Sequence, residues 1–325
     1  MKMDARPPVL AAERLTVQVG RRDVCRELDF TLQAGDTLVI LGRNGAGKTT
    51  LLHTLAGLRD AARGAVLLSG QPYAGWPRGH EACLRGLLAQ SQPDFFSATV
   101  LETALVGRHP YLGRWDWEGP DDEAIALAAL AQMGLESFAT RQVPTLSGGE
   151  RQRLAIATLL VQQPRLYLLD EPLAHLDLHH QVAVLDHFRG LAGSGAGVVM
   201  VLHDINLTAR YASHVLLLNG EGGHVIGPAA EVLTTGRLSA AFGHPLRAIA
   251  DAEGITSLEV FTLAYFVITF GWHLPAHKLL STGDSSTAAL RKLLVSHAAR
   301  TTTVARGGFG ARASSGSSSS SGFGG

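Results

Sequence analysis

The chain has 325 residues, and its 28 Lys or Arg residues balance its 28 Asp or Glu residues, so the formal net charge is zero. A balanced charge argues against a broad basic surface, and we expect no nucleic-acid partner. Cys25 and Cys83 offer neither a disulfide framework nor a CxxC zinc spacing, which is typical of a reducing compartment. The longest uncharged apolar stretch, residues 260–272, is shorter than the roughly 20 residues that a membrane-spanning helix needs.

The first elements predicted along the chain are strands. Residues 15–19 alternate in the manner of a strand, and the apolar run at residues 37–41 predicts a buried parallel strand that ends at Gly42. Apolar residues then recur at helical spacing over residues 47–56, and Gly57 follows where a helix C-cap is expected. The segment GRNGAGKTT is therefore a loop between a strand and a helix.

The middle of the chain changes character, and we predict a small helical subdomain at residues 93–146. An acidic turn at residues 121–123 leads into an alanine-rich helix that Gly134 ends. The sequence then predicts two helices and two strands in alternation, which indicates a doubly wound parallel sheet. Their predicted ranges are a helix at 150–162, a strand at 165–169, a helix near 179–191 and a strand at 197–202.

The C-terminal part of the chain has a different composition. From about residue 301 it is rich in Gly and Ser, which predicts disorder because such a segment buries too little apolar surface. The apolar run at 260–272 has three interpretations: an amphipathic docking segment, an extension particular to this lineage, or translation in a wrong reading frame. We favour the last two over a function for this segment.

One motif predicts a phosphate-binding loop. Residues 42–49 match GxxxxGK[ST], in which glycines let several backbone N–H groups face one anion at the start of a helix. Lys48 adds a point charge for the β- and γ-phosphates, and the Thr49 hydroxyl is a hard oxygen ligand for Mg²⁺. The residues predicted to bind the nucleotide here are Gly42, Arg43, Asn44, Gly45, Ala46, Gly47, Lys48, Thr49 and Thr50.

Two further segments, LSGGERQ at 146–152 and LYLLDEP at 166–172, make the chain resemble ATP-binding cassette (ABC) ATPases from about Leu10 to Arg247. The resemblance implies an ATPase that uses ATP and Mg²⁺. It implies an α/β P-loop core with a parallel sheet flanked by helices, an N-terminal antiparallel β portion and the helical subdomain. The cassette then spans residues 10–247, and residues 250–325 form an atypical C-terminal extension.

Several catalytic and metal-binding residues are predicted at the ends of strands. The strand at 165–169 delivers Asp170 and Glu171 to the carboxyl edge of the sheet, where open α/β sheets bind ligands. We expect Asp170 to bind Mg²⁺ and Glu171 to polarise or deprotonate the attacking water. By the resemblance, His203 contacts the γ-phosphate, and Gln90 reaches both Mg²⁺ and the water, with Gln92 as the competing glutamine.

A second anion site is predicted at the segment LSGGE. Ser147 and Gly149 stand at the start of a helix, and within one compact subunit they cannot bind the phosphate that Lys48 binds. The resemblance implies a head-to-tail homodimer. In it Ser147, Gly148 and Gly149 of one copy cover the ATP on the other copy, and Asp177 lies at the dimer interface.

The base-binding position departs from the family pattern. ABC ATPases place an aromatic residue about where Val19 stands, to stack on adenine, but here the neighbours of Val19 are a glycine and two arginines. Arg21 and Arg22 are therefore the candidates to stack on the base. This departure bears on which bases the site selects.

The segment VGRHPYLGRW at 106–115 resembles ATPases of iron-siderophore, haem and vitamin B12 importers. We expect Arg108 and nearby aromatics to dock on a permease, unless Tyr111, Trp115 and Trp117 pack the core of the subdomain. The resemblance implies a permease partner and a periplasmic or surface binding protein reached through it. It also implies a peripheral position on the cytoplasmic face of the inner (plasma) membrane.

Soluble ABC ATPases are the alternative class. A DNA-repair type has a long coiled coil that does not fit in the 99 residues between Lys48 and Ser147, and a translation type normally has two cassettes. Import of nickel, molybdate or amino acids remains open within the transporter class.

Overall fold

The computed structural model describes residues 8–77, 79–90, 98–250 and 256–260. The chain divides into two units, residues 1–262 and residues 263–325, and the second lies wholly outside the described residues. The expected disorder from residue 301, nearly all of the apolar run at 260–272, and Gln92 also lie outside them. The proposed division of the chain at residues 247–250 stays a prediction.

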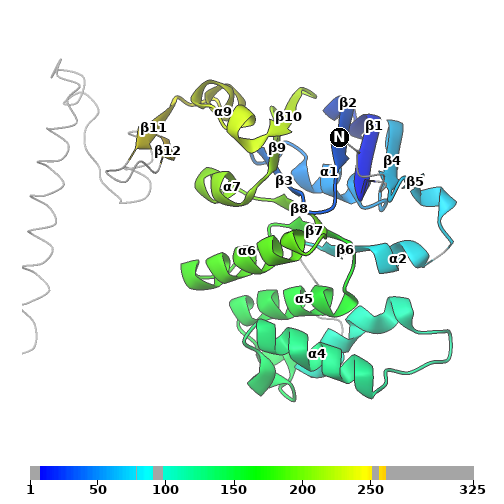
Figure 1. The fold of residues 1–325 in the computed structure, drawn as a ribbon. Helices are drawn as coiled ribbons and strands as arrows, with labels where there is room; N and C mark the ends of the chain where they lie inside the picture. The colour runs from blue at the N-terminus through cyan, green and yellow to red at the C-terminus, as the bar shows by residue number, and fades with distance from the viewer. Residues whose placement is uncertain (1–7, 78, 91–97, 251–255, 261–325) are drawn as a thin grey trace, which may run out of the picture. The chain divides into compact units, whose positions relative to one another are not determined.

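A six-stranded sheet in the order β10-β9-β3-β8-β7-β6 forms the centre of the cassette (Figure 1). The five strands from β9 to β6 are parallel, and only β10 pairs antiparallel with its neighbour. β3, β7 and β8 are buried along their whole length, which explains their continuous apolar runs. The predicted parallel sheet is confirmed. Its strands are β3 (Thr37–Gly42), β6 (Arg85–Leu88), β7 (Leu166–Asp170), β8 (Gly197–Val201), β9 (His214–Leu218) and β10 (His224–Pro228).

A four-stranded antiparallel sheet in the order β2-β1-β4-β5 forms the N-terminal β portion, as the resemblance implied. Its first strand begins five residues before the predicted strand at 15–19. The pairing register shifts between Ala12 and Leu15, and Arg14 has a φ of 43°, so a bulge breaks the alternation that marks a strand in the sequence. The strands are β1 (Leu10–Val19), β2 (Arg22–Leu32), β4 (Arg63–Leu68) and β5 (Gln71–Pro72).

The two faces of the central sheet belong to two hydrophobic cores. In β3, Leu38 and Ile40 pack with α1 (Lys48–Leu55) and the antiparallel sheet, whereas Val39 and Leu41 face the core that contains α5 (Gly148–Gln162) and α6 (Leu178–Gly193). Figure 1 shows α1 beside β1 and β2, with α5 and α6 on the opposite side of the sheet. Because successive side chains of β3 point to opposite faces of the sheet, this one strand contributes to both hydrophobic cores.

The helical subdomain packs α3 (Val100–Leu105) and α4 (Pro120–Gln132) against α5. Gly134, at a φ of 64°, follows the end of α4, as its sequence position indicated. No helix in the described ranges has the length and apolar character needed to cross a bilayer. The remaining short elements are η1 (Tyr73–Gly75), α2 (His80–Leu84), η2 (Val106–Tyr111), η3 (Glu136–Phe138), η4 (Val143–Thr145), α7 (Ile205–Tyr211), α8 (Ala229–Val232), α9 (Thr235–Phe242), β11 (Leu246–Ala250) and β12 (Thr256–Val260).

Candidate nucleotide-binding site

A cavity of about 560 Å³ lies where four neighbouring parallel strands end. The phosphate loop follows β3, His203 follows β8, Glu171 follows β7 and Gln90 follows β6, so the sheet order brings four sequence-distant segments to one edge. Most of the lining residues are those that the sequence predicted. The full lining of the cavity consists of Val19, Arg22, Val24, Asn44, Gly45, Ala46, Gly47, Lys48, Thr49, Thr50, Gln90, Glu171 and His203.

Glycines shape the phosphate loop for steric reasons. Gly42, Gly45 and Gly47 all have positive φ, at 152°, 75° and 95°. A Cβ at position 47 would lie 2.5 Å from a Val24 methyl carbon, and one at position 42 would lie 2.8 Å from the Leu218 carbonyl oxygen. Side chains are therefore excluded at both ends of the loop, and the backbone is left to face the cavity.

Lys48 is held inside this loop. Its side chain is almost fully buried, and its ammonium donates to the carbonyl oxygens of Gly42 at 2.9 Å and Arg43 at 3.1 Å. Gly42 and Arg43 thus fix the lysine without lining the cavity themselves. Burial lowers the pKa of Lys48, and the charge of Glu171 opposes that shift. Among the described residues no side chain caps the N-terminus of α1, so its first N–H groups are open to a phosphate.

Asp170 is fully buried behind the cavity, at the end of β7. No hydrogen bond of standard geometry from the described residues reaches either carboxylate oxygen. Burial raises the pKa of Asp170 and the charge of Glu171 adds to this effect, while the neighbouring Thr49 hydroxyl and the charge of Lys48 oppose it. A buried carboxylate beside a hydroxyl, with no standard hydrogen bond from the described residues, is a donor set that fits Mg²⁺, which prefers hard oxygen ligands.

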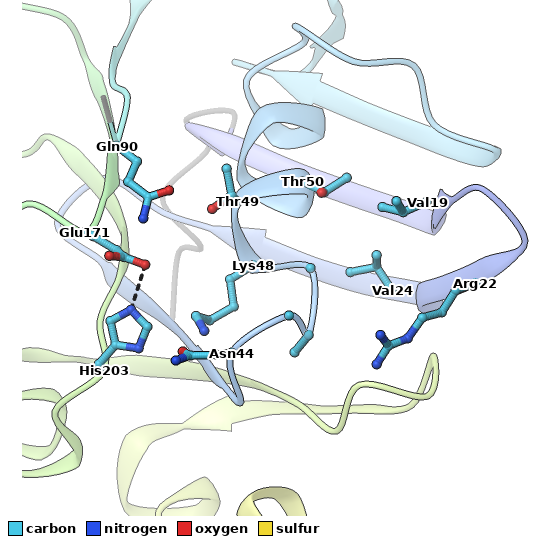
Figure 2. Close-up of a pocket in the computed structure, with 13 residues that line it drawn as sticks. Val19, Arg22, Val24, Asn44, Lys48, Thr49, Thr50, Gln90, Glu171 and His203 are labelled. Atoms are coloured by element: carbon cyan, nitrogen blue, oxygen red, sulfur yellow. Dashed lines mark hydrogen bonds and ion pairs between the residues drawn. The ribbon is translucent and has the colours of Figure 1, made fainter. Parts of the chain in front are cut away.

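Glu171 and His203 form a pair across the cavity from the phosphate loop. His203 Nε2 lies 2.7 Å from Glu171 Oε1, and Figure 2 shows both side chains on the same side as Gln90, facing Lys48. Glu171 has a φ of 50°, in a region that residues other than glycine rarely adopt. The turn after β7 therefore directs this carboxylate into the cavity, toward Lys48.

The predicted second anion site lies elsewhere in the chain, because Ser147, Gly148 and Gly149 do not line the cavity. Ser147 caps α5: its Oγ accepts from the Glu150 N–H at 3.3 Å, and its own N–H donates to Glu150 Oε2 at 2.7 Å. These bonds lower the pKa of Glu150. The sequence signal S-x-x-E was present, and it explains why α5 begins at Gly148 rather than at the predicted residue 150.

Asp177 is likewise outside the cavity lining. Its carboxylate caps α6 by accepting from the His180 N–H at 2.9 Å, and it lies 2.8 Å from His180 Nδ1. Those contacts lower the pKa of Asp177. Within one chain the structure does not bring Ser147 or Asp177 to the nucleotide, and their roles at a dimer interface stay predictions.

The end of the cavity beyond the phosphate loop is formed by Val19, Arg22 and Val24. Of the two candidate arginines, Arg22 lines the cavity and Arg21 does not. The sequence reasoning missed Val24, although its place two residues after Arg22 in the same strand puts it on the same face.

The docking prediction for the subdomain needs correction at Arg108. The Arg108 side chain is only 13% exposed, with Nε 2.7 Å from Asp122 Oδ1 and its guanidinium 4.2 Å from the centre of the Tyr111 ring. Arg108 therefore stabilises the subdomain internally instead of projecting toward a partner. Trp115 and Trp117 are 83% and 87% exposed, so the alternative that they pack the core is wrong.

The fold and the cavity together define a P-loop nucleoside triphosphatase. The ABC transporter family model matches residues 25–174. The chain is 43% identical over 249 residues to a hemin import ATP-binding protein, HmuV, of Deinococcus radiodurans, covering 74% of this chain and 93% of the relative. It is 40% identical to HmuV of Gloeobacter violaceus over 72% of this chain and 87% of that one.

A solved structure described as an inward-facing, putative metal-chelate type ABC transporter is also similar. It superposes with a TM-score of 0.70 at 29% identity, over 79% of this chain and 99% of the other. The chain belongs to the ABC transporter family and is one of its ATP-binding subunits, with ATP hydrolysis as its activity.

Proposed function

We propose that this chain is the ATP-hydrolysing subunit of an importer that takes up haem or another iron chelate. The similarity to the Deinococcus hemin import subunit, which extends over 93% of that protein, is the observation that carries the proposal. The similar metal-chelate transporter supports the same substrate class. Cobalamin and molybdate importers, and soluble ATPases of the translation or DNA-repair type, are the alternatives.

Different residues around the cavity bind the phosphates, hold Mg²⁺ and activate the attacking water. Lys48 and the N-terminus of α1 bind the phosphates, and Thr49, Asp170 and Gln90 would hold Mg²⁺, which supplies charge neutralisation on the phosphate oxygens. Glu171 accepts the proton of the attacking water. His203 contacts the γ-phosphate, and its 2.7 Å contact with Glu171 orients that carboxylate.

The remaining parts of the proposal concern assembly. We place two copies of this chain head to tail, each bound to a permease subunit on the cytoplasmic face of the inner (plasma) membrane. A periplasmic or surface binding protein delivers the substrate to the permease. The reason for the dimer is that Ser147, Gly148 and Gly149 make an anion site which their own chain does not bring to its cavity.

Growth on a single iron source tests this function. The gene is deleted in the source organism, and the deletion strain is complemented with the wild-type chain or with Lys48→Ala. We expect the deletion strain to lose growth on hemin as sole iron source, and only the wild-type chain to restore it, while cobalamin uptake is unchanged. Normal growth of the deletion strain both on hemin and on ferric siderophores as sole iron source, or loss of cobalamin uptake alone, would refute the proposed substrate class.

A further inference from the structure

The cavity has two chemically different ends. Figure 2 shows Gln90, Glu171 and His203 at one end, the phosphate loop in the middle, and Val19, Val24 and Arg22 at the other end. A nucleoside triphosphate whose γ-phosphate faces Glu171 and whose phosphates follow the loop must place its base at the Val19 end. The contacts there decide which bases the protein accepts.

Hydrogen bonds along one edge of the guanidinium hold Arg22 at this end of the cavity. Its Nε donates to the Gly220 carbonyl oxygen at 2.9 Å, and its Nη2 donates to the same oxygen. Gly220 has a φ of 85° in the turn between β9 and β10, and a Cβ there would lie 3.2 Å from Arg22 Nη2 and 3.9 Å from the Cβ of Ala46. The turn therefore holds the guanidinium beside the phosphate loop, in a position where a larger residue than glycine would crowd it.

These hydrogen bonds use the edge of the guanidinium and leave its faces for stacking. Guanidinium planes stack on aromatic rings, and bases stack on such surfaces with little regard to sequence. No aromatic side chain in the described part of the chain lines the cavity, so Arg22 is the flat group at its base end. Val19, 45% exposed, and Val24 add apolar surface around it.

Apart from Arg22, whose Nε and Nη2 donate to Gly220, no residue of the described lining at this end has a side-chain group that distinguishes one purine from another. Adenine and guanine differ in the donors and acceptors on their edges, and a site separates them strongly only where it hydrogen-bonds those edges. Val19 and Val24 have no polar side-chain atoms, and the other polar lining residues belong to the phosphate loop, the first turn of α1 or the Glu171 end.

We propose that Arg22 is the stacking platform for the base, and that the site accepts guanosine triphosphate nearly as well as ATP. This inference rests on the proposed nucleotide-hydrolysing function and adds its base specificity. The substrate class is then purine nucleoside triphosphates.

Arg22→Ala tests the stacking contact, with Arg21→Ala as the matched control because it removes the same charge one residue away, outside the cavity. We expect Arg22→Ala to raise the dissociation constant for ATP and for GTP by about tenfold each, and Arg21→Ala to change neither by more than about twofold. Affinities are measured by isothermal titration with the purified chain and Mg²⁺. Equal nucleotide affinity in Arg22→Ala and wild type would overturn the proposal.

Inorganic tripolyphosphate separates stacking from a charge contact with the phosphates. It carries no base, so we expect Arg22→Ala to bind it as well as wild type does. Arg22→Lys, which keeps the charge and loses the plane, is expected to remain defective for ATP. Loss of tripolyphosphate affinity in Arg22→Ala, or rescue of ATP binding by lysine, would overturn the stacking role and assign Arg22 to the phosphates. If Arg22→Ala does not fold, as judged by its thermal melt, the lysine variant decides.

Hydrolysis tests base selectivity. We expect wild-type kcat/KM for GTP to lie within about tenfold of that for ATP, since only stacking would act on the base. A larger preference for either purine would overturn the proposed selectivity. A wild-type chain that hydrolyses no triphosphate and binds no tripolyphosphate would instead refute the nucleotide-hydrolysing function, so the two failures are distinguishable.

Discussion

Glu171 holds an unfavourable backbone conformation at the centre of the site. A positive φ in a residue other than glycine costs on the order of 1–3 kcal/mol, and such strain persists only where the surroundings enforce it. Here the buried strand β7 precedes the residue, and the Glu171 carbonyl accepts from the Ala174 N–H at 3.2 Å in the following turn. The result is a carboxylate that faces both His203 and the phosphate loop.

Replacing Glu171 by glutamine separates nucleotide binding from turnover. The amide has the same shape and can still contact His203, but it cannot take a proton from water. We expect ATP hydrolysis to fall by about 10²–10⁴-fold, while ATP affinity stays within about twofold of wild type. Phosphate release and equilibrium nucleotide binding measure the two effects. Glu136→Gln, at an exposed position outside the cavity, is the control; hydrolysis by Glu171→Gln at the wild-type rate would contradict the role of Glu171.

At the scale of elements, the sequence predicted those parts of the site in which neighbours in the chain are also neighbours in space. The phosphate loop joins β3 directly to α1, and Asp170 and Glu171 end β7, so each could be read from one short segment. The Arg22 contact could not, because its partner Gly220 is 198 positions away in a turn with no motif of its own. Exposure of Trp115 and Trp117 also depends on packing that no local pattern encodes.

Arg108 lies in the segment 106–115 that resembles iron-chelate and vitamin B12 importers, but its contacts are with its own subdomain and the adjoining α5. Besides its ion pair with Asp122, it donates to the Val161 carbonyl near the C-terminus of α5. Asp122 also accepts from the Gly119 N–H at 3.0 Å at the start of α4. Arg108 thus connects the beginning of α4 to the end of the helix that Ser147 caps, and it orients one helix relative to the other.

Truncation of Arg108 is expected to weaken the subdomain. Arg108→Ala removes the hydrogen bonds to the Asp122 carboxylate and the Val161 carbonyl, and we expect the urea midpoint of unfolding to fall below that of wild type. Arg114 is the matched control, since it lies over the ring of the exposed Trp115, and Arg114→Ala should change stability by less than about 0.5 kcal/mol. Urea denaturation followed by circular dichroism measures both. Equal stability of Arg108→Ala and wild type would show that the ion pair contributes nothing.

At the scale of the whole molecule, the nucleotide cavity and the proposed second anion site at Ser147 lie apart within one chain. The cavity has the phosphate loop and Glu171, whereas Ser147 begins α5 outside the cavity lining. A helix N-terminus attracts anions through its free N–H groups, and a second subunit could bring such an end over the bound nucleotide. In that arrangement ATP belongs to the interface, so nucleotide and dimerisation must be thermodynamically linked.

Dimerisation on ATP can be tested in the Glu171→Gln background, where slow turnover leaves the triphosphate intact. We expect this variant to be monomeric without nucleotide and dimeric with ATP and Mg²⁺, as measured by size-exclusion chromatography with light scattering. Adding Ser147→Asp keeps a good N-cap for α5 and places a negative charge where the second phosphate contact would form, so the double variant should stay monomeric while still binding ATP. A dimer of unchanged stability in the double variant, or a Glu171→Gln chain that remains monomeric both alone and with its permease, would contradict the head-to-tail arrangement.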